Sequence, residues 1–284
     1  MNTVKTVLLL GALSGLLLVL GEAFGGHNGL YLGLALAVAM NFLSYFFSDK
    51  IALATYGAQP VTPDQNPGVY ARVYPIVAGL AQRMGIPMPT LWLIPDNSPN
   101  AFATGRNPQH ASVAFTAGIL QAMSDAEIEG VVAHELGHVL HRDILISSVA
   151  ATIASAITFL ARMSFFFGGR REDEEEGGGW SAVLMMVLAP FAAMLIQLAI
   201  SRNREYDADA ASAKYTGRPG ELISALQKLD AYSKQLPMQA TPSTAHLFII
   251  KPFTGASLMK WFSTHPPTEE RIARLRQIAA GARA

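Results

Sequence analysis

The pentapeptide His134-Glu135-Leu136-Gly137-His138 contains the residue types of a metal-dependent hydrolytic site. On a helix, residues four positions apart lie on one face, so the two imidazoles can point at one cation about 2 Å from each ring nitrogen. Glu135 lies one step round the helix, where it can accept a proton from water without binding the metal. Zinc, one ion per chain, is the expected cofactor, because two imidazoles and a carboxylate leave a fourth position open for water.

The carboxylate that completes such a site is expected between Ser201 and Asp209. If this segment is helical, Glu205 and Asp209 share one face. We expect Glu205 to bind the metal because its side chain is longer, and Asp209 to accept the other ring N–H of a ligand histidine. The alternative is a charged, solvated helix face with no role in metal binding.

The elements that position these residues can be predicted from local signals. Ser124 and Glu127 form a capping box, which predicts a helix from Asp125 to about Asp143 that carries the two histidines. Further helices are predicted over Val69–Met84, Ser201–Tyr215, Glu221–Lys234 and Glu269–Ala279. Extended segments are predicted at Thr90–Ile94, Asn100–Thr104 and Ala111–Thr116. The expected fold class is therefore α+β: mainly α with a small β-sheet.

Charged residues are absent from four long runs of the chain, which indicates a membrane protein. The runs are Thr6–Gly21, Ala23–Ser48, Ile144–Ala161 and Gly177–Ser201. About 20 apolar residues are needed to cross a bilayer as a helix. The first two runs predict a transmembrane hairpin over residues 1–48, and a cleaved signal peptide over residues 1–25 is the competing interpretation. Lys5 and Lys50 flank this hairpin, which favours cytoplasmic ends.

The other two runs predict a second hydrophobic hairpin over residues 144–201. It either crosses the bilayer or lies in it as a shallow or re-entrant hairpin. In both cases the chain returns to its starting side, so residues 49–143 and 202–284 share one compartment. Together these two segments are long enough for one compact protease domain, with the hairpin inserted into it.

Composition excludes several classes of site and partner. The chain has no cysteine, which excludes disulfides, cysteine-bound zinc and thiol nucleophiles. The 21 basic and 21 acidic side chains give a net charge of zero, so there is no electrostatic reason to expect a nucleic acid partner.

Three motifs, in order, resemble the M48 family of zinc metalloproteases: His134–His138, Ser201–Asp209 and His265–Ile272. The N-terminal hydrophobic hairpin and the segment Asn100–Gly105 are similar to the bacterial membrane branch of that family, the HtpX proteases. The resemblance covers nearly the whole chain. It implies a membrane-anchored, zincin-type domain in which His134, His138 and Glu205 bind zinc and Glu135 is catalytic. It further implies a multi-pass protein of the bacterial inner membrane whose active site faces the cytoplasm, acting under stress on misfolded or membrane proteins.

Two further parts of the site are expected from the sequence. His265 has two interpretations: it donates to the oxyanion that develops beside the zinc, or it caps the helix that follows it. An extended substrate is expected to pair by backbone hydrogen bonds with an edge strand, which requires that strand to be exposed. The residues of this strand are Asn100, Ala101, Phe102, Ala103 and Thr104.

Three alternative functions are compatible with parts of this sequence. An intramembrane protease is disfavoured because charged residues such as Glu127, Glu129 and Arg142 flank the histidine motif densely. A zinc transporter would need ionisable residues inside the apolar runs. A non-catalytic membrane scaffold or adaptor with a structural zinc remains the alternative, and its mark would be the loss of Glu135, which this chain retains.

Overall fold

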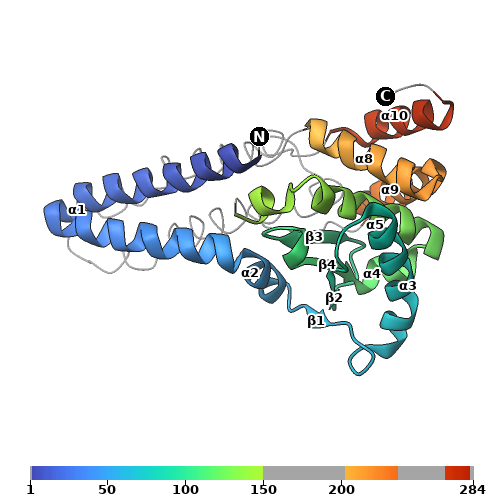
Figure 1. Ribbon diagram of the computed structural model, residues 1–284, viewed down its shortest axis with the longest axis horizontal. Coiled ribbons are helices and arrows are strands. Elements are labelled where there is room, and N and C mark those ends of the chain that lie inside the picture. The colour runs from blue at the N-terminus through green and yellow to red at the C-terminus, as the bar shows by residue number, and fades with distance from the viewer. Residues whose placement is uncertain (1, 150–201, 236–265, 282–284) are drawn as a thin grey trace.

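The computed structural model describes residues 2–149, 202–235 and 266–281 (Figure 1). Its helices are α1 (Asn2–Phe46), α2 (Ser48–Thr55), α3 (Pro67–Met84), α4 (Ala117–Ala122), α5 (Asp125–Leu140), α8 (Arg202–Thr216), α9 (Pro219–Gln235) and α10 (Thr268–Ala279), with one short 3-10 turn, η1 (Pro108–His110). Its strands are β1 (Gln59–Pro60), β2 (Thr90–Ile94), β3 (Ala101–Gly105) and β4 (Ala111–Thr116). A mainly helical chain with a small mixed sheet confirms the predicted fold class.

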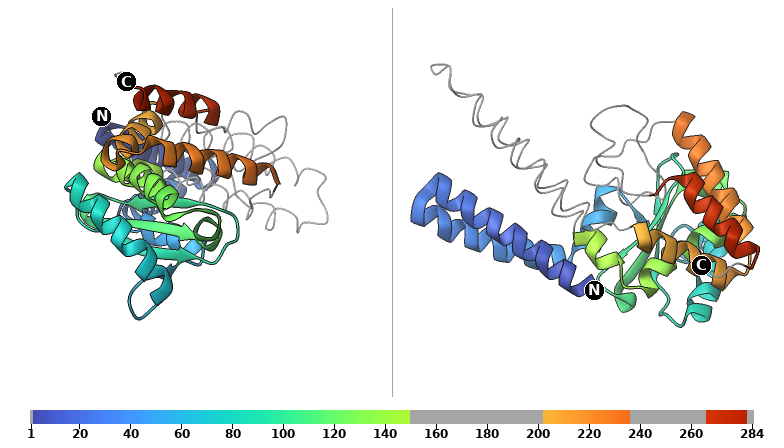
Figure 2. Two further views of the ribbon diagram at one scale, coloured as in Figure 1. Left: turned by 90° about the vertical axis from the view of Figure 1, so that its right-hand side faces the viewer. Right: turned by 90° about the horizontal axis from the view of Figure 1, so that it is seen from above.

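The N-terminal helix α1 is a hairpin of two apolar legs. The legs, Val4–Glu22 and Gly26–Phe46, have mean hydropathies of 2.1 and 1.6, and each is long enough to span a membrane. The chain reverses at Gly26, whose φ of 55° is a conformation that side chains disfavour. A Cβ at Gly21 would lie 2.2 Å from the Gly29 carbonyl oxygen, so the legs meet there only because both residues are glycine. Figure 2 shows the paired legs projecting from the rest of the molecule, which confirms the two predicted apolar helices.

The sheet has the strand order β1-β2-β4-β3, with β2 parallel to β4 and the outer strands antiparallel. Helix α2 covers one face, where Leu53 packs with Phe102 and Ala114. Helices α3 and α5 cover the other face, where Val113 and Phe115 belong to the main core. Because both faces are covered, every residue of β3 and β4 is buried.

The expectation of an exposed docking strand is wrong for β3. Among the described strands, β3 does lie at the edge of the sheet and pairs with β4 alone. However, all its residues are buried, and two of its outward N–H groups have internal partners: the Ala103 N–H donates to the Glu135 carboxylate at 2.9 Å, and the Gly105 N–H donates to Ser148 Oγ at 3.5 Å. A short hydrophobic run predicted the strand correctly, but it carries no information on the helices that cover it.

One core joins segments that precede and follow residues 150–201 in the chain. Val113 and Val132 share it with Leu222, Leu226 and Leu275. Residues 144–149 are helical, and within them Ile146 and Val149 pack against the first leg of α1. The remainder of the predicted hairpin, residues 150–201, lies outside the described residues, so its membrane crossing and the domain boundaries stay predictions.

The capping box at the start of α5 is confirmed. Ser124 Oγ accepts from the Glu127 N–H, and Glu127 accepts from the Ser124 N–H at 2.8 Å. The same carboxylate accepts from Ser224 and Lys228 of α9, so it fastens the start of α5 to the C-terminal helices. Burial alone would raise the pKa of Glu127, but hydrogen bonds from Lys228 and the two serines outweigh it and lower the pKa to about 2.

Glu127→Gln is expected to lower the free energy of unfolding by about 2 kcal/mol at pH 7. Because the pKa is lower in the folded state, this contribution is present above about pH 4.5 and is lost as the pH falls towards 2. The melting temperature of the detergent-solubilised protein measures it, and the gap between wild type and variant should close over that pH range. Glu129→Gln, which removes a carboxylate of the same helix that pairs with the partly exposed Arg83 and Arg218, should have a smaller effect on the free energy of unfolding at pH 7. A gap that is constant with pH would contradict the assignment.

Candidate metal centre

Helices α5 and α8 bring together three side chains that the sequence analysis proposed as metal ligands. One donor atom from each of His134, His138 and Glu205 lies within 4.8 Å of the others. Nε2 of His134 is 3.6 Å from Glu205 Oε2, and Nε2 of His138 is 3.6 Å from Glu205 Oε1. His134 and Glu205 are buried, and His138 is partly exposed, which leaves the cluster accessible from one side.

The close approach of α5 to α8 depends on small residues. Gly137, between the two histidines, faces α8, where a Cβ at this position would lie 3.1 Å from Ala208 Cα and 3.2 Å from Ala211 Cβ. A larger side chain would therefore push α8 away and carry Glu205 with it. The glycine inside the histidine motif thus sets the distance between the two imidazoles and the carboxylate.

Two of the three donor separations in the cluster are close to those around a tetrahedral metal ion. Two ligands bound at about 2.1 Å to a tetrahedral ion lie about 3.4 Å apart. The two nitrogen–oxygen separations of 3.6 Å are close to this value. Two imidazoles and one carboxylate are also the donors of known catalytic zinc sites, which keep the fourth position open.

Asp209 lies where the sequence analysis expected the orienting carboxylate. Its Oδ1 is 2.9 Å from Nδ1 of His134, which leaves Nε2 of that ring turned towards Glu205. Burial and the charge of Arg271 act to lower the pKa of His134, but hydrogen bonds to Asp209 and Glu205 outweigh them and raise it to about 9. The metal-free centre therefore favours a positively charged His134 held between two carboxylates.

Arg271 of α10 also belongs to the centre, and the sequence analysis gave it no role. Its guanidinium binds Asp209 through two hydrogen bonds, Nε–Oδ2 at 2.9 Å and Nη2–Oδ1 at 2.7 Å, and its Nη1 lies 3.8 Å from Glu205 Oε2. Although burial raises the pKa of Asp209, Arg271 and His134 outweigh that effect, and the net pKa is lowered. The sequence contains one signal of this role. Arg271 lies four residues before Leu275, so helical spacing places a charged arginine on the apolar, buried face of α10.

Asp143 is a second residue that the sequence analysis left without a role. The helix predicted to reach Asp143 ends at Leu140 instead. Arg142 adopts a φ of 59°, and the Asp143 N–H donates to the His138 carbonyl at 2.9 Å, which is a Schellman ending. This reversal brings Asp143 Oδ2 to 3.5 Å from Nδ1 of His138, so each histidine has a carboxylate beside its Nδ1. The sequence did not reveal it because the reversing residue is an arginine rather than the usual glycine.

Glu135 is buried beside the cluster, one residue along α5 from His134. Its carboxylate accepts the Ala103 N–H of β3 at 2.9 Å, which fixes its orientation. The geometry therefore places a proton acceptor next to the three candidate ligands. His265, the other candidate catalytic residue, lies outside the described residues.

Comparisons of the sequence with known proteins agree on one family. Residues 69–279 match the sequence profile described as peptidase family M48. The chain is 51% identical to a protein named "Protease HtpX homolog" from Desulforapulum autotrophicum, and the alignment covers 97% of this chain and 89% of the relative. It is also 51% identical to a protein of the same name from Thermodesulfovibrio yellowstonii, with 98% of this chain and 99% of the relative covered. In overall fold it is similar to the crystal structure of S. mikatae Ste24p, with a TM-score of 0.53 and 20% identity; the alignment covers 96% of this chain but only 65% of Ste24p.

Proposed function

The chain belongs to peptidase family M48, and from that premise we propose that it is a membrane-bound zinc metalloendopeptidase. The observation that carries the proposal is the convergence of His134, His138 and Glu205 on one point beside the buried carboxylate of Glu135. Family membership implies a metal cofactor, and two imidazoles with one carboxylate favour a single zinc ion.

Each residue of the centre has a separate role in amide hydrolysis. A bound zinc ion would lower the pKa of water towards about 7 and polarise the scissile carbonyl. Glu135 accepts the proton of the attacking water and then delivers it to the leaving amine. Asp209 holds His134 with its Nε2 towards the site, and Arg271 holds Asp209 in place.

The α1 hairpin supports a location of the reaction at a membrane. Two apolar helices tether the catalytic helices to a bilayer, so proteins embedded in or emerging from that bilayer are the nearest substrates. Lys5 and Lys50 flank the hairpin and favour the cytoplasm for both its ends. We place the enzyme in a bacterial inner membrane as a multi-pass protein whose active site faces the cytoplasm and acts on misfolded or membrane proteins.

The proposal is tested by cleavage of casein, an unfolded protein, with the purified full chain in detergent. Activity should disappear when a chelator removes the metal and return when zinc is added. Cleavage that persists after the metal content has fallen to zero would exclude the proposed function.

The affinity for zinc is expected to rise with pH. Because His134 has a pKa of about 9 in the metal-free protein, its proton must leave before Nε2 can bind the ion. Below pH 9 this competition alone makes the affinity about tenfold stronger for each unit that the pH rises. Competition with a chromogenic chelator between pH 6 and 8 measures the slope. A flat profile would show that His134 is not a ligand that must first lose a proton.

A further inference from the structure

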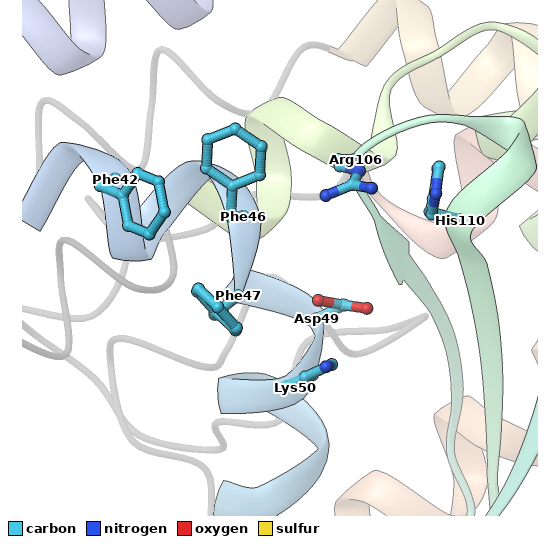
Figure 3. A pocket seen from close by; sticks show the side chains of 7 residues that line it. All are labelled: Phe42, Phe46, Phe47, Asp49, Lys50, Arg106 and His110. Carbon is cyan, nitrogen blue, oxygen red and sulfur yellow. The ribbon is translucent and has the colours of Figure 1, made fainter.

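A cavity of about 240 Å³ lies where α1 passes into α2 and faces the turn between β3 and β4. It shares no residue with the metal centre. Figure 3 shows aromatic side chains and Lys50 on the α1–α2 side and Arg106 and His110 on the opposite turn. The described residues that line it are Phe42, Phe46, Phe47, Asp49, Lys50, Arg106 and His110.

The cavity lies at the end of a membrane-spanning leg. The apolar leg Gly26–Phe46 places Phe42 one helical turn inside the span and Lys50 one turn beyond it. The cavity therefore opens at the depth where acyl chains give way to headgroups, the layer in which aromatic and basic residues gather.

Its walls combine apolar surface with two cations. The ring of Phe42 lies 4.8 Å from that of Phe46 and 6.1 Å from that of Phe47. The Arg106 guanidinium lies 5.5 Å over Phe46, and the Lys50 ammonium 5.5 Å over Phe47. Within residues 2–149, 202–235 and 266–281, no carboxylate lies at ion-pair distance from Lys50 or Arg106, so the rings hold both cations without neutralising them.

The charge of the cavity matches one phosphodiester. Among the described residues that line the cavity, Lys50 and Arg106 contribute two positive charges and Asp49 one negative charge, a formal charge of +1 when histidine is counted as neutral. An ammonium headgroup would find the Phe46 and Phe47 faces already taken by cations. The volume is below the roughly 300–1,000 Å³ of pockets that enclose drug-sized ligands, so it suits a headgroup whose chains lie outside.

We propose that this cavity binds the headgroup of an anionic phosphoglyceride from the bilayer. The phosphodiester lies between Lys50 and Arg106, and one acyl chain runs along Phe42 into the membrane. Arg106 directly follows β3, whose Ala103 donates to Glu135, so the bound lipid holds the strand beside the proposed catalytic carboxylate at a fixed depth.

Native mass spectrometry of the full chain in detergent tests this, with phosphatidylglycerol and phosphatidylcholine of identical acyl chains as probes. Wild type should retain one phosphatidylglycerol in preference to phosphatidylcholine. Lys50→Gln and Arg106→Gln should each weaken its binding about fivefold, because one basic residue near a membrane surface contributes about that factor. Lys214→Gln is the matched control, because Lys214 also rests on a ring, that of Tyr215 in α8, away from the cavity.

The outcomes separate the lipid from other ligands. Loss of phosphatidylglycerol in both single variants, with Lys214→Gln unchanged, supports the site, and agreement between variants on two different elements excludes local misfolding as the cause. Wild-type retention of phosphatidylglycerol by a variant that carries both Lys50→Gln and Arg106→Gln, or equal binding of phosphatidylcholine by the wild type, overturns the proposal. Displacement of the lipid by millimolar inorganic phosphate would show a free-phosphate site instead. None of these readouts depends on proteolysis.

Discussion

Replacement of Glu135 by glutamine is expected to reduce kcat/KM for peptide hydrolysis about a hundredfold to ten-thousandfold while zinc stays near one ion per chain. General acid–base catalysis contributes a factor of about 10² to 10⁴, and glutamine can neither accept nor deliver the proton. The metal should be retained because none of the three candidate ligands changes. The glutamine oxygen can also still accept the Ala103 N–H, so the strand beside the site keeps its contact.

The comparison that makes this result specific is Glu129→Gln. Glu129 lies on the same helix and pairs with Arg83 and Arg218 rather than with the metal centre. Its replacement removes the same charge from α5 and should leave cleavage close to the wild-type rate. If Glu135→Gln keeps more than a tenth of the activity at full zinc occupancy, Glu135 is not the residue that carries the proton.

Replacement of Glu205 by alanine should weaken zinc binding more than about a hundredfold. Loss of a residue that only orients a ligand costs about 10- to 100-fold, and loss of a ligand should cost more. Glu205 lies 3.6 Å from Nε2 of both histidines, and no other described His, Cys, Asp or Glu joins that cluster. Activity at limiting zinc should fall in parallel with occupancy.

Substitutions of two other α8 residues should weaken zinc binding less than Glu205→Ala does. Asp207 is exposed on the same helix, so Asp207→Ala should bind zinc as the wild type does. Asp209→Asn should fall between the two, because it disturbs the orientation of His134 without removing a ligand. Glu205→Gln, which keeps the volume of the side chain, separates loss of the ligand from loss of packing. An affinity unchanged in both Glu205 variants would place the third ligand elsewhere.

The parts of the fold that the sequence predicted well have strong local signals. The capping box at Ser124 marked the start of α5, and Gly85 and Gly217 close α3 and α8 in the left-handed conformation expected of helix ends. The i, i+4 spacing of His134 and His138 and of Glu205 and Asp209 depends only on helix geometry. For this reason the candidate metal ligands could be predicted without knowledge of any tertiary contact.

The parts that the sequence did not predict depend on tertiary packing. The burial of β3 requires α2 on one face and α5 on the other, and the sequence of a five-residue strand predicts neither contact. The turn that brings Asp143 to His138 depends on Arg142 adopting a conformation usually left to glycine. The pairing of Arg271 with Asp209 joins residues 62 positions apart, across a stretch that no local pattern spans.

The central claim is that two imidazoles and one carboxylate hold a single cation beside Glu135. X-ray absorption at the zinc edge of the metal-loaded protein tests it most directly. The predicted spectrum has a nearest shell of nitrogen and oxygen at about 2.0–2.1 Å, with outer scattering from two imidazole rings. A site with three or more imidazoles, or with none, would contradict the assignment of His134, His138 and Glu205.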